Sequence, residues 1–191
     1  MRGSRPPDIQ ALEDAYDAAE RDARSLVDGL SETFGTWRAE PASWSVAECL
    51  DHLATANRVY LDAMQPSAER ALMSGRRRRG PAQPGLIGGW FVRTLEPPVK
   101  TSRKMKAPRK IVPRKGPALA DASSAFLASQ VDVRGFLQKY ADIDLAGVHF
   151  PNPFIAGLRF SLATGLHVIA SHERRHLWQA WNVRRAAERG H

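Results

Sequence analysis

Apolar side chains recur every three or four positions along most of the chain, the spacing that gives an α-helix one buried face. Polar and charged side chains fill the remaining positions. This pattern predicts four long amphipathic helices, over residues 8–34, from 45 to 66 or a turn or two beyond, 118–141 and 155–188. Neither a strand-like alternation nor an internal repeat is visible. The predicted fold class is therefore all-α, a four-helix bundle.

Two helix starts carry recognisable capping residues. Ser45 can accept the backbone amide of Glu48, and the Glu48 carboxylate can reach back to the Ser45 amide, which is the reciprocal pattern of a capping box. Asp8 is placed to cap the first helix with its side-chain oxygen. These residues set the expected beginnings of the first and second helices.

A long basic segment separates the second predicted helix from the third. Residues 74–117 are rich in Pro, Gly, Arg and Lys, and we expect one short helix over 86–95 within an otherwise exposed crossover loop. Residues 76–115 hold 13 Lys and Arg and one acid, a net charge of +12. Since the whole chain carries +8, the remainder carries −4. The basic character therefore belongs to an insertion and not to the bundle.

Length and composition limit the possible classes. The 191 residues, 43% of them apolar, suit one globular domain over 1–191 with 74–117 as an insertion. No apolar run approaches the roughly 20 residues that cross a bilayer, and residues 1–8 lack the apolar core of a secretory signal. Cys49 is the one cysteine, so an internal disulfide is impossible. We therefore expect a cytoplasmic protein with no membrane partner.

Two of the six histidines form the clearest chemical pattern. His172 and His176 are four positions apart, so on a helix both rings lie on one face, a turn apart, and can bind one ion. They share the apolar, inward stripe of the last helix, whereas His167 lies about 140° around the helix from His172 and should not join them. A pair of hydrogen-bonded core histidines is the alternative. His52, on the second helix, is a candidate third ligand, although by itself it would suggest a structural role.

Two segments together resemble the DinB/YfiT-like family. Residues 44–53 read WSVAECLDHL and match the family pattern of Trp-Ser, then Glu, then His-Leu at the start of the second helix. Residues 172–179 read HERRHLWQ and match the closing His-x-x-x-His-x-x-Gln. The order and separation of the segments also agree. The chain departs from the family in its long basic insertion and in residues 149–154, which read HFPNPF where many members have a His-Pro-x-x-Gly turn.

The resemblance implies a DinB-like four-helix bundle in which His52, His172 and His176 bind zinc, nickel or a similar divalent ion. Members of known activity are thiol-dependent transferases and isomerases that use bacillithiol, mycothiol or glutathione. By analogy we expect a metal-dependent transferase or isomerase that uses a low-molecular-weight thiol and acts on a small-molecule substrate. The same analogy suggests a homodimer.

Three neutral imidazoles leave a fourth coordination position for water or substrate, as in catalytic zinc sites. The ion could lower the pKa of bound water and generate hydroxide, or bind a thiol as the thiolate, and the second role fits the family activities better. Glu48 and Gln179 are candidates to orient the imidazoles, and Arg175 is a candidate to bind an anionic substrate. The alternatives are the capping box for Glu48, core hydrogen bonding for Gln179 and a surface salt bridge for Arg175.

Several neighbouring residues have simpler interpretations. Asp51 is expected to be a solvated surface acid, and Cys49 a small buried side chain. Trp44, Trp178 and Trp181 are expected in the core or in the wall of the pocket.

The basic insertion allows three interpretations. It can be a solvated loop, a site that binds nucleic acid or another polyanion through phosphate contacts, or a gate for anionic substrates. Trp90 and Phe91 are the aromatic residues among its charges, so base stacking has little support. The second function hypothesis is therefore a non-catalytic helical bundle that binds nucleic acid or another polyanion through this loop.

Overall fold

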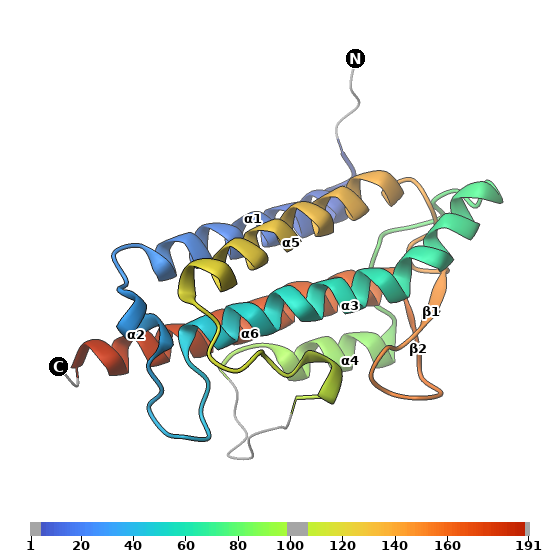
Figure 1. Ribbon diagram of the computed structural model, residues 1–191. Coiled ribbons are helices and arrows are strands. Elements are labelled where there is room, and N and C mark those ends of the chain that lie inside the picture. The colour runs from blue at the N-terminus through green and yellow to red at the C-terminus, as the bar shows by residue number, and fades with distance from the viewer. Residues whose placement is uncertain (1–4, 99–106, 190–191) are drawn as a thin grey trace.

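Four long helices form a bundle, two running in each direction, in the computed structural model, which describes residues 5–98 and 107–189 (Figure 1). They are α1 (Pro7–Val27), α3 (Val46–Met73), α5 (Leu119–Tyr140) and α6 (Leu162–Arg189). Helices α1 and α3 each pack against both α5 and α6. The predicted all-α four-helix bundle is confirmed. In the part of the chain that the structure describes, no helix is long and apolar enough to span a membrane.

The first helix is shorter than its apolar pattern predicts. A single helix over 8–34 is wrong, because α1 ends at Val27 and a short helix, α2 (Glu32–Thr36), follows. Gly29 adopts a positive φ of 65°, which turns the chain out of the helix at little steric cost. Ser31 then accepts the amide of Phe34 and caps α2.

The prediction that Asp8 caps α1 is wrong. The N-cap residue is Pro6, with no side-chain hydrogen bond. The Asp8 carboxylate instead accepts both the guanidinium of Arg78, at 2.6 and 2.7 Å, and the amide of Ala82. An acid at the start of the bundle thus binds the basic insertion.

The capping box of the second long helix is confirmed. The Ser45 hydroxyl accepts the Glu48 amide at 3.2 Å, and the Ser45 amide donates to the Glu48 carboxylate at 2.9 Å. Helix α3 continues through Pro66 to Met73, two turns further. The box fixes the first turn of α3, and His52 lies one turn beyond it.

A short hairpin precedes the last helix, so the expectation of no strand is wrong. Strands β1 (His149–Pro151) and β2 (Arg159–Ser161) pair antiparallel, with Phe150 opposite Phe160. Both phenylalanines are buried in the core. The hairpin occupies positions that the helical pattern assigned to the last helix, which therefore begins at Leu162 and not at 155. Strands of three residues are too short for their alternation to be recognised in a sequence.

The insertion is folded against the bundle rather than forming one exposed loop. It contains the predicted short helix, α4 (Leu86–Leu95), which packs on α6, and a 3₁₀ turn, η1 (Arg109–Ile111), which contacts α3. Ala82, Leu95 and Ile111 are buried. Four of its basic residues lie outside the described ranges: Lys100, Arg103, Lys104 and Lys106.

A layer of buried polar side chains divides the apolar core into two clusters. One cluster includes Leu12, Tyr60, Leu137 and Leu166, and the other includes Leu26, Leu50, Phe126 and Leu177. Between them lies what we call the polar layer, made of Asn57, Ser129, Gln130 and Glu173. One Glu173 oxygen accepts from the amides of Asn57 at 2.8 Å and Gln130 at 2.6 Å. Burial raises the pKa of Glu173 to about 7.

The packing of α4 on α6 can be tested at two adjacent glycines. A Cβ on Gly88 would lie 2.7 Å from the Thr164 Cγ2, whereas a Cβ on Gly89 would make ordinary contacts of 3.6 Å or more. Gly88→Ala should lower the free energy of unfolding by about 1–3 kcal/mol through overpacking. Gly89→Ala should be neutral or stabilising by up to about 1 kcal/mol, since alanine favours a helix. Urea denaturation followed by circular dichroism measures both, and equal effects would contradict this packing.

Candidate metal centre

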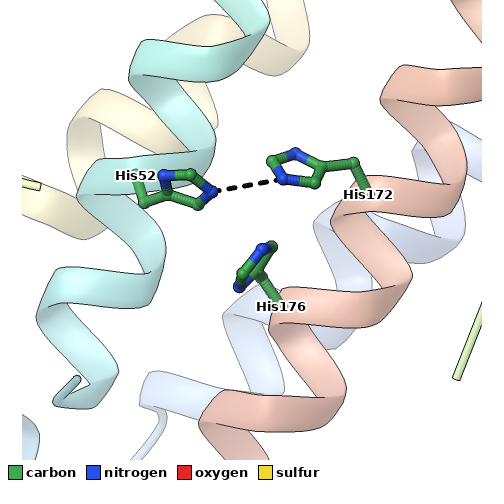
Figure 2. A group of neighbouring side chains, drawn as sticks. All are labelled: His52, His172 and His176. Atoms are coloured by element: carbon green, nitrogen blue, oxygen red, sulfur yellow. Dashed lines mark hydrogen bonds between the residues drawn. The ribbon is translucent and has the colours of Figure 1, made fainter. Parts of the chain in front are cut away.

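The three predicted histidines lie together between two helices (Figure 2). His52 comes from α3, while His172 and His176 come from successive turns of α6. One ring nitrogen from each lies within 4.8 Å of the other two. His52 and His176 are buried and His172 is half-buried. Two distant parts of the sequence therefore converge as predicted.

The spacing of the rings fits a metal ion. The Nε2 atoms of His52 and His172 lie 3.2 Å apart. Two nitrogens bound to one tetrahedral zinc at about 2.0–2.1 Å would be about 3.3 Å apart. In the absence of an ion this contact is a hydrogen bond that needs one proton, and a cation would replace that proton. The donor set is therefore of the right type and size.

Hydrogen bonds on the far sides of two rings fix which nitrogen faces the centre. The Nδ1–H of His52 donates to the backbone carbonyl of Ile111. The Nδ1–H of His176 donates to the Gln179 Oε1 at 3.0 Å. A ring protonated on Nδ1 keeps the lone pair on Nε2, the form that binds a metal. Gln179 thus contacts a predicted ligand, as the sequence suggested it would.

Burial keeps the three imidazoles neutral. It lowers the pKa of His52, although the bond to Ile111 and the charge of Asp51 act in the opposite direction. The pKa values of His172 and His176 fall well below the usual range through burial, through repulsion from the other imidazoles, and through the nearby positive charge of Arg175. A neutral imidazole is the protonation state that binds metal ions.

An indole ring forms one wall of the centre. The Trp44 ring lies 4.7 Å from the His52 ring and 5.6 Å from the His176 ring, measured between centroids. This position in the pocket wall agrees with the prediction for Trp44. Trp178 is 40% exposed, so its expected burial is wrong. Trp181 is half-buried and donates to Asp22 on α1 at 2.8 Å.

The insertion is bound to the helix that carries His52. The Asp51 carboxylate accepts the backbone amide of Arg114 at 2.8 Å and its Nε at 2.7 Å. Asp51 is 3% exposed, so its interpretation as a solvated surface acid is wrong. Together with the bond from His52 to Ile111, this pair holds residues 111–114 against α3. We call residues 111–114 the strap. Nothing in the sequence indicates that a backbone carbonyl would orient His52.

The remaining candidates have partners away from the three rings. Glu48 binds Arg38 in addition to the Ser45 amide, so its carboxylate stabilises the start of α3. Arg175 donates to the carbonyl of Thr94, in α4, at 3.4 Å. Its positive charge also acts to lower the pKa values of His172 and His176. His167 contacts the carbonyl of Ala82 and stays apart, as predicted.

Cys49 is a small buried side chain in the apolar core, as expected. Burial and the neighbouring Glu48 charge raise the pKa of its thiol far above the usual range. A thiol that stays protonated is a poor nucleophile and a poor metal ligand. Cys49 therefore takes no part in the chemistry of the centre.

Comparison with known proteins identified one family. A family model described as the DinB superfamily matches residues 15–180. The matched region begins in α1, ends in α6 and includes all three histidines. Neither the curated proteins nor the solved structures gave a match.

The contact between the strap and α3 makes a testable prediction. Asp51→Asn removes the charge that binds Arg114, and bonds to charged groups contribute about 1.5–3 kcal/mol. Amide exchange in residues 111–114 should therefore become about tenfold faster or more, as measured by hydrogen-exchange mass spectrometry. Asp62→Asn, at an exposed position on the same helix, is the matched control. Equal exchange in the two variants would show that Asp51 does not hold the strap.

Proposed function

The chain belongs to the DinB superfamily, and from that premise we propose that it binds one divalent metal ion, zinc or nickel, through His52, His172 and His176. The observation that carries the proposal is the convergence of three neutral imidazoles from two helices, with ring nitrogens within 4.8 Å of one another. A buried group of three histidines with no ion would leave a polar centre at the edge of the core.

The proposed centre is catalytic in type rather than structural. Structural zinc is usually enclosed by four protein ligands, most often with cysteine among them. In residues 5–98 and 107–189 no fourth histidine, cysteine or carboxylate joins the three imidazoles. Nitrogen ligands of this kind suit zinc, nickel, copper and iron. When bound, the ion would supply Lewis acidity at its open position.

We further propose that the centre serves a transferase or isomerase that uses a low-molecular-weight thiol. The DinB-like resemblance suggests this activity, and the state of Cys49 is consistent with it. Because burial keeps that thiol protonated, the chain offers no sulfur nucleophile of its own. The thiol would therefore have to enter as a cosubstrate.

The residues around the rings would each have a separate role. Ile111 and Gln179 orient the imidazoles of His52 and His176 through Nδ1. Trp44 shields these two rings from water on one side. Arg175, which is half-buried and follows His172 by three positions on α6, would bind an anionic group of the thiol or of its electrophilic partner.

The alternative function, polyanion binding through the basic insertion, has less support. Arg78 and Arg114 of that segment bind Asp8 and Asp51 of the bundle, so part of its charge holds the insertion in place. No described contact points to a nucleic acid. The metal-dependent function is therefore our conclusion.

Metal analysis tests the ligand set directly. Purified protein should contain about one equivalent of divalent metal, and cobalt substitution should give the visible spectrum of a nitrogen-bound ion. His52→Gln alone, and His172→Ala with His176→Ala, should abolish both signals, because two imidazoles hold an ion far more weakly than three. His149→Gln, at an exposed histidine in the hairpin, should change neither. A metal-free wild type, or retention of metal by His52→Gln, would refute the proposal.

The thiol can be tested separately from the metal. Adding thiols to the cobalt-substituted protein should shift its spectrum, and the metal-loaded protein should consume a thiol together with an electrophile. Arg175→Gln should raise the KM for an anionic thiol about tenfold while leaving metal content unchanged, since it removes one charged hydrogen bond. Arg185→Gln, at an exposed position on the same helix, is the control. Intact metal binding with no response to any thiol would refute the proposal that the protein uses a thiol, but not the proposal that it binds a metal ion.

A further inference from the structure

A basic cavity lies at the opposite end of α3 from the histidines. It is an open depression of about 780 Å³, bordered by the last turns of α3, the chain that follows them and the β hairpin. Arg70, Arg76, Arg159 and His149 line it, above a floor that includes Ala71 and Val148. The volume falls within the range of small-molecule sites, roughly 300–1,000 Å³.

Each of the three guanidinium groups is held by oxygen atoms of the protein. Arg70 donates to the Ser67 hydroxyl at 3.1 Å, and Arg159 donates to the His149 carbonyl at 3.1 Å. Arg76 donates to the Gly147 carbonyl at 2.9 Å and to the Asp144 carboxylate at 3.1 Å. The groups are thus positioned before any ligand arrives, which reduces the entropy lost on binding.

The charge around the cavity is not balanced. Asp144 neutralises Arg76, but no carboxylate in the described ranges pairs with Arg70 or Arg159. The oxygens that hold these two side chains belong to a hydroxyl and a carbonyl, which accept hydrogen bonds without cancelling charge. Like charges held around one cavity repel one another, and an anion placed among them removes that cost.

We propose that this cavity binds a phosphate group of a small molecule. Arginine presents several N–H donors in a planar fork that matches the oxygens of phosphate, and two unpaired guanidiniums supply the charge for a dianion. The Ser67 hydroxyl, which accepts from Arg70, adds a donor through its own proton. The apolar floor leaves room for an organic part of the ligand.

The cavity is separate from the candidate metal centre. With a rise of 1.5 Å per residue, the α3 positions of His52 and Arg70 are about 27 Å apart. Neither the strap nor α4 is among the residues that line it. The proposal therefore holds or fails independently of the metal.

Calorimetric titration at constant ionic strength tests the site, with inorganic phosphate and glycerol phosphate as probes. Both should bind the wild type, and Arg70→Gln with Arg159→Gln should weaken binding about tenfold or more, because charged hydrogen bonds are lost. Arg21→Gln with Arg58→Gln removes the same charge from exposed positions on α1 and α3, and should leave the affinity unchanged. Arg76 is kept in both variants because it binds Asp144.

Two comparisons complete the test. The His172→Ala, His176→Ala variant should bind phosphate as the wild type does, which separates this cavity from the metal centre. Tighter binding of glycerol phosphate than of inorganic phosphate would support an organic ligand on the apolar floor. The proposal is overturned if the wild type binds neither probe, if both double arginine variants lose affinity equally, or if a DNA duplex alone binds.

Discussion

The need to give every buried polar group a hydrogen-bond partner governs the middle of this bundle. Between the two apolar clusters, α6 carries His172, Glu173 and His176 within little more than one turn. Glu173 accepts from Asn57 and Gln130, and the two histidines meet His52. Because unpaired buried polar groups cost several kcal/mol, each side of α6 needs a defined set of partners. The polar layer and the histidine centre therefore fix the rotation of α6 against α3 and α5.

Charge explains why Glu173 can occupy this position. Burial raises its pKa to about 7, so near neutral pH a large fraction of the side chain is the uncharged acid. Its second oxygen, and the carbonyl oxygens of Asn57 and Gln130, have no partner among the described residues. A protonated carboxyl supplies one donor where these acceptors gather, which lowers the cost of burying them. The histidines solve the same problem differently, since burial keeps them neutral and the Nε2 atoms of His52 and His172 form a hydrogen bond with each other.

Local sequence patterns correctly predicted the features that depend on interactions between residues close in the sequence. The capping box at Ser45 and the pair His172 and His176 involve residues three or four apart, and both were found where expected. The prediction of a single helix over 8–34 is wrong because Gly29 ends the helix although the apolar pattern continues beyond it. The hairpin was not predicted because each of its strands is three residues long. Asp51 was misread because its partner, Arg114, lies 63 positions away.

The +12 charge of the insertion and the −4 of the remainder account for how the insertion is held. Acids on two different helices, Asp8 and Asp51, accept from Arg78 and Arg114 of the insertion. In the second case the consequence reaches the candidate metal centre, because the strap that binds Asp51 also supplies the Ile111 carbonyl to His52. Composition revealed the charge asymmetry, but only the fold shows which acid meets which base.

The exposure of the three rings differs and limits the side from which a molecule could reach the proposed metal centre. His52 is 1% exposed and His176 is 8% exposed, whereas His172 is half-buried. The strap lies behind His52, and Trp44 covers one side of His52 and His176, so the accessible side is that of His172. Arg175, three positions after His172, donates to the carbonyl of Thr94 in the last turn of α4, which is packed on α6 through Gly88. The insertion therefore orients His52 through Ile111 and contacts Arg175 through α4, so its fold would constrain the geometry of the proposed metal centre.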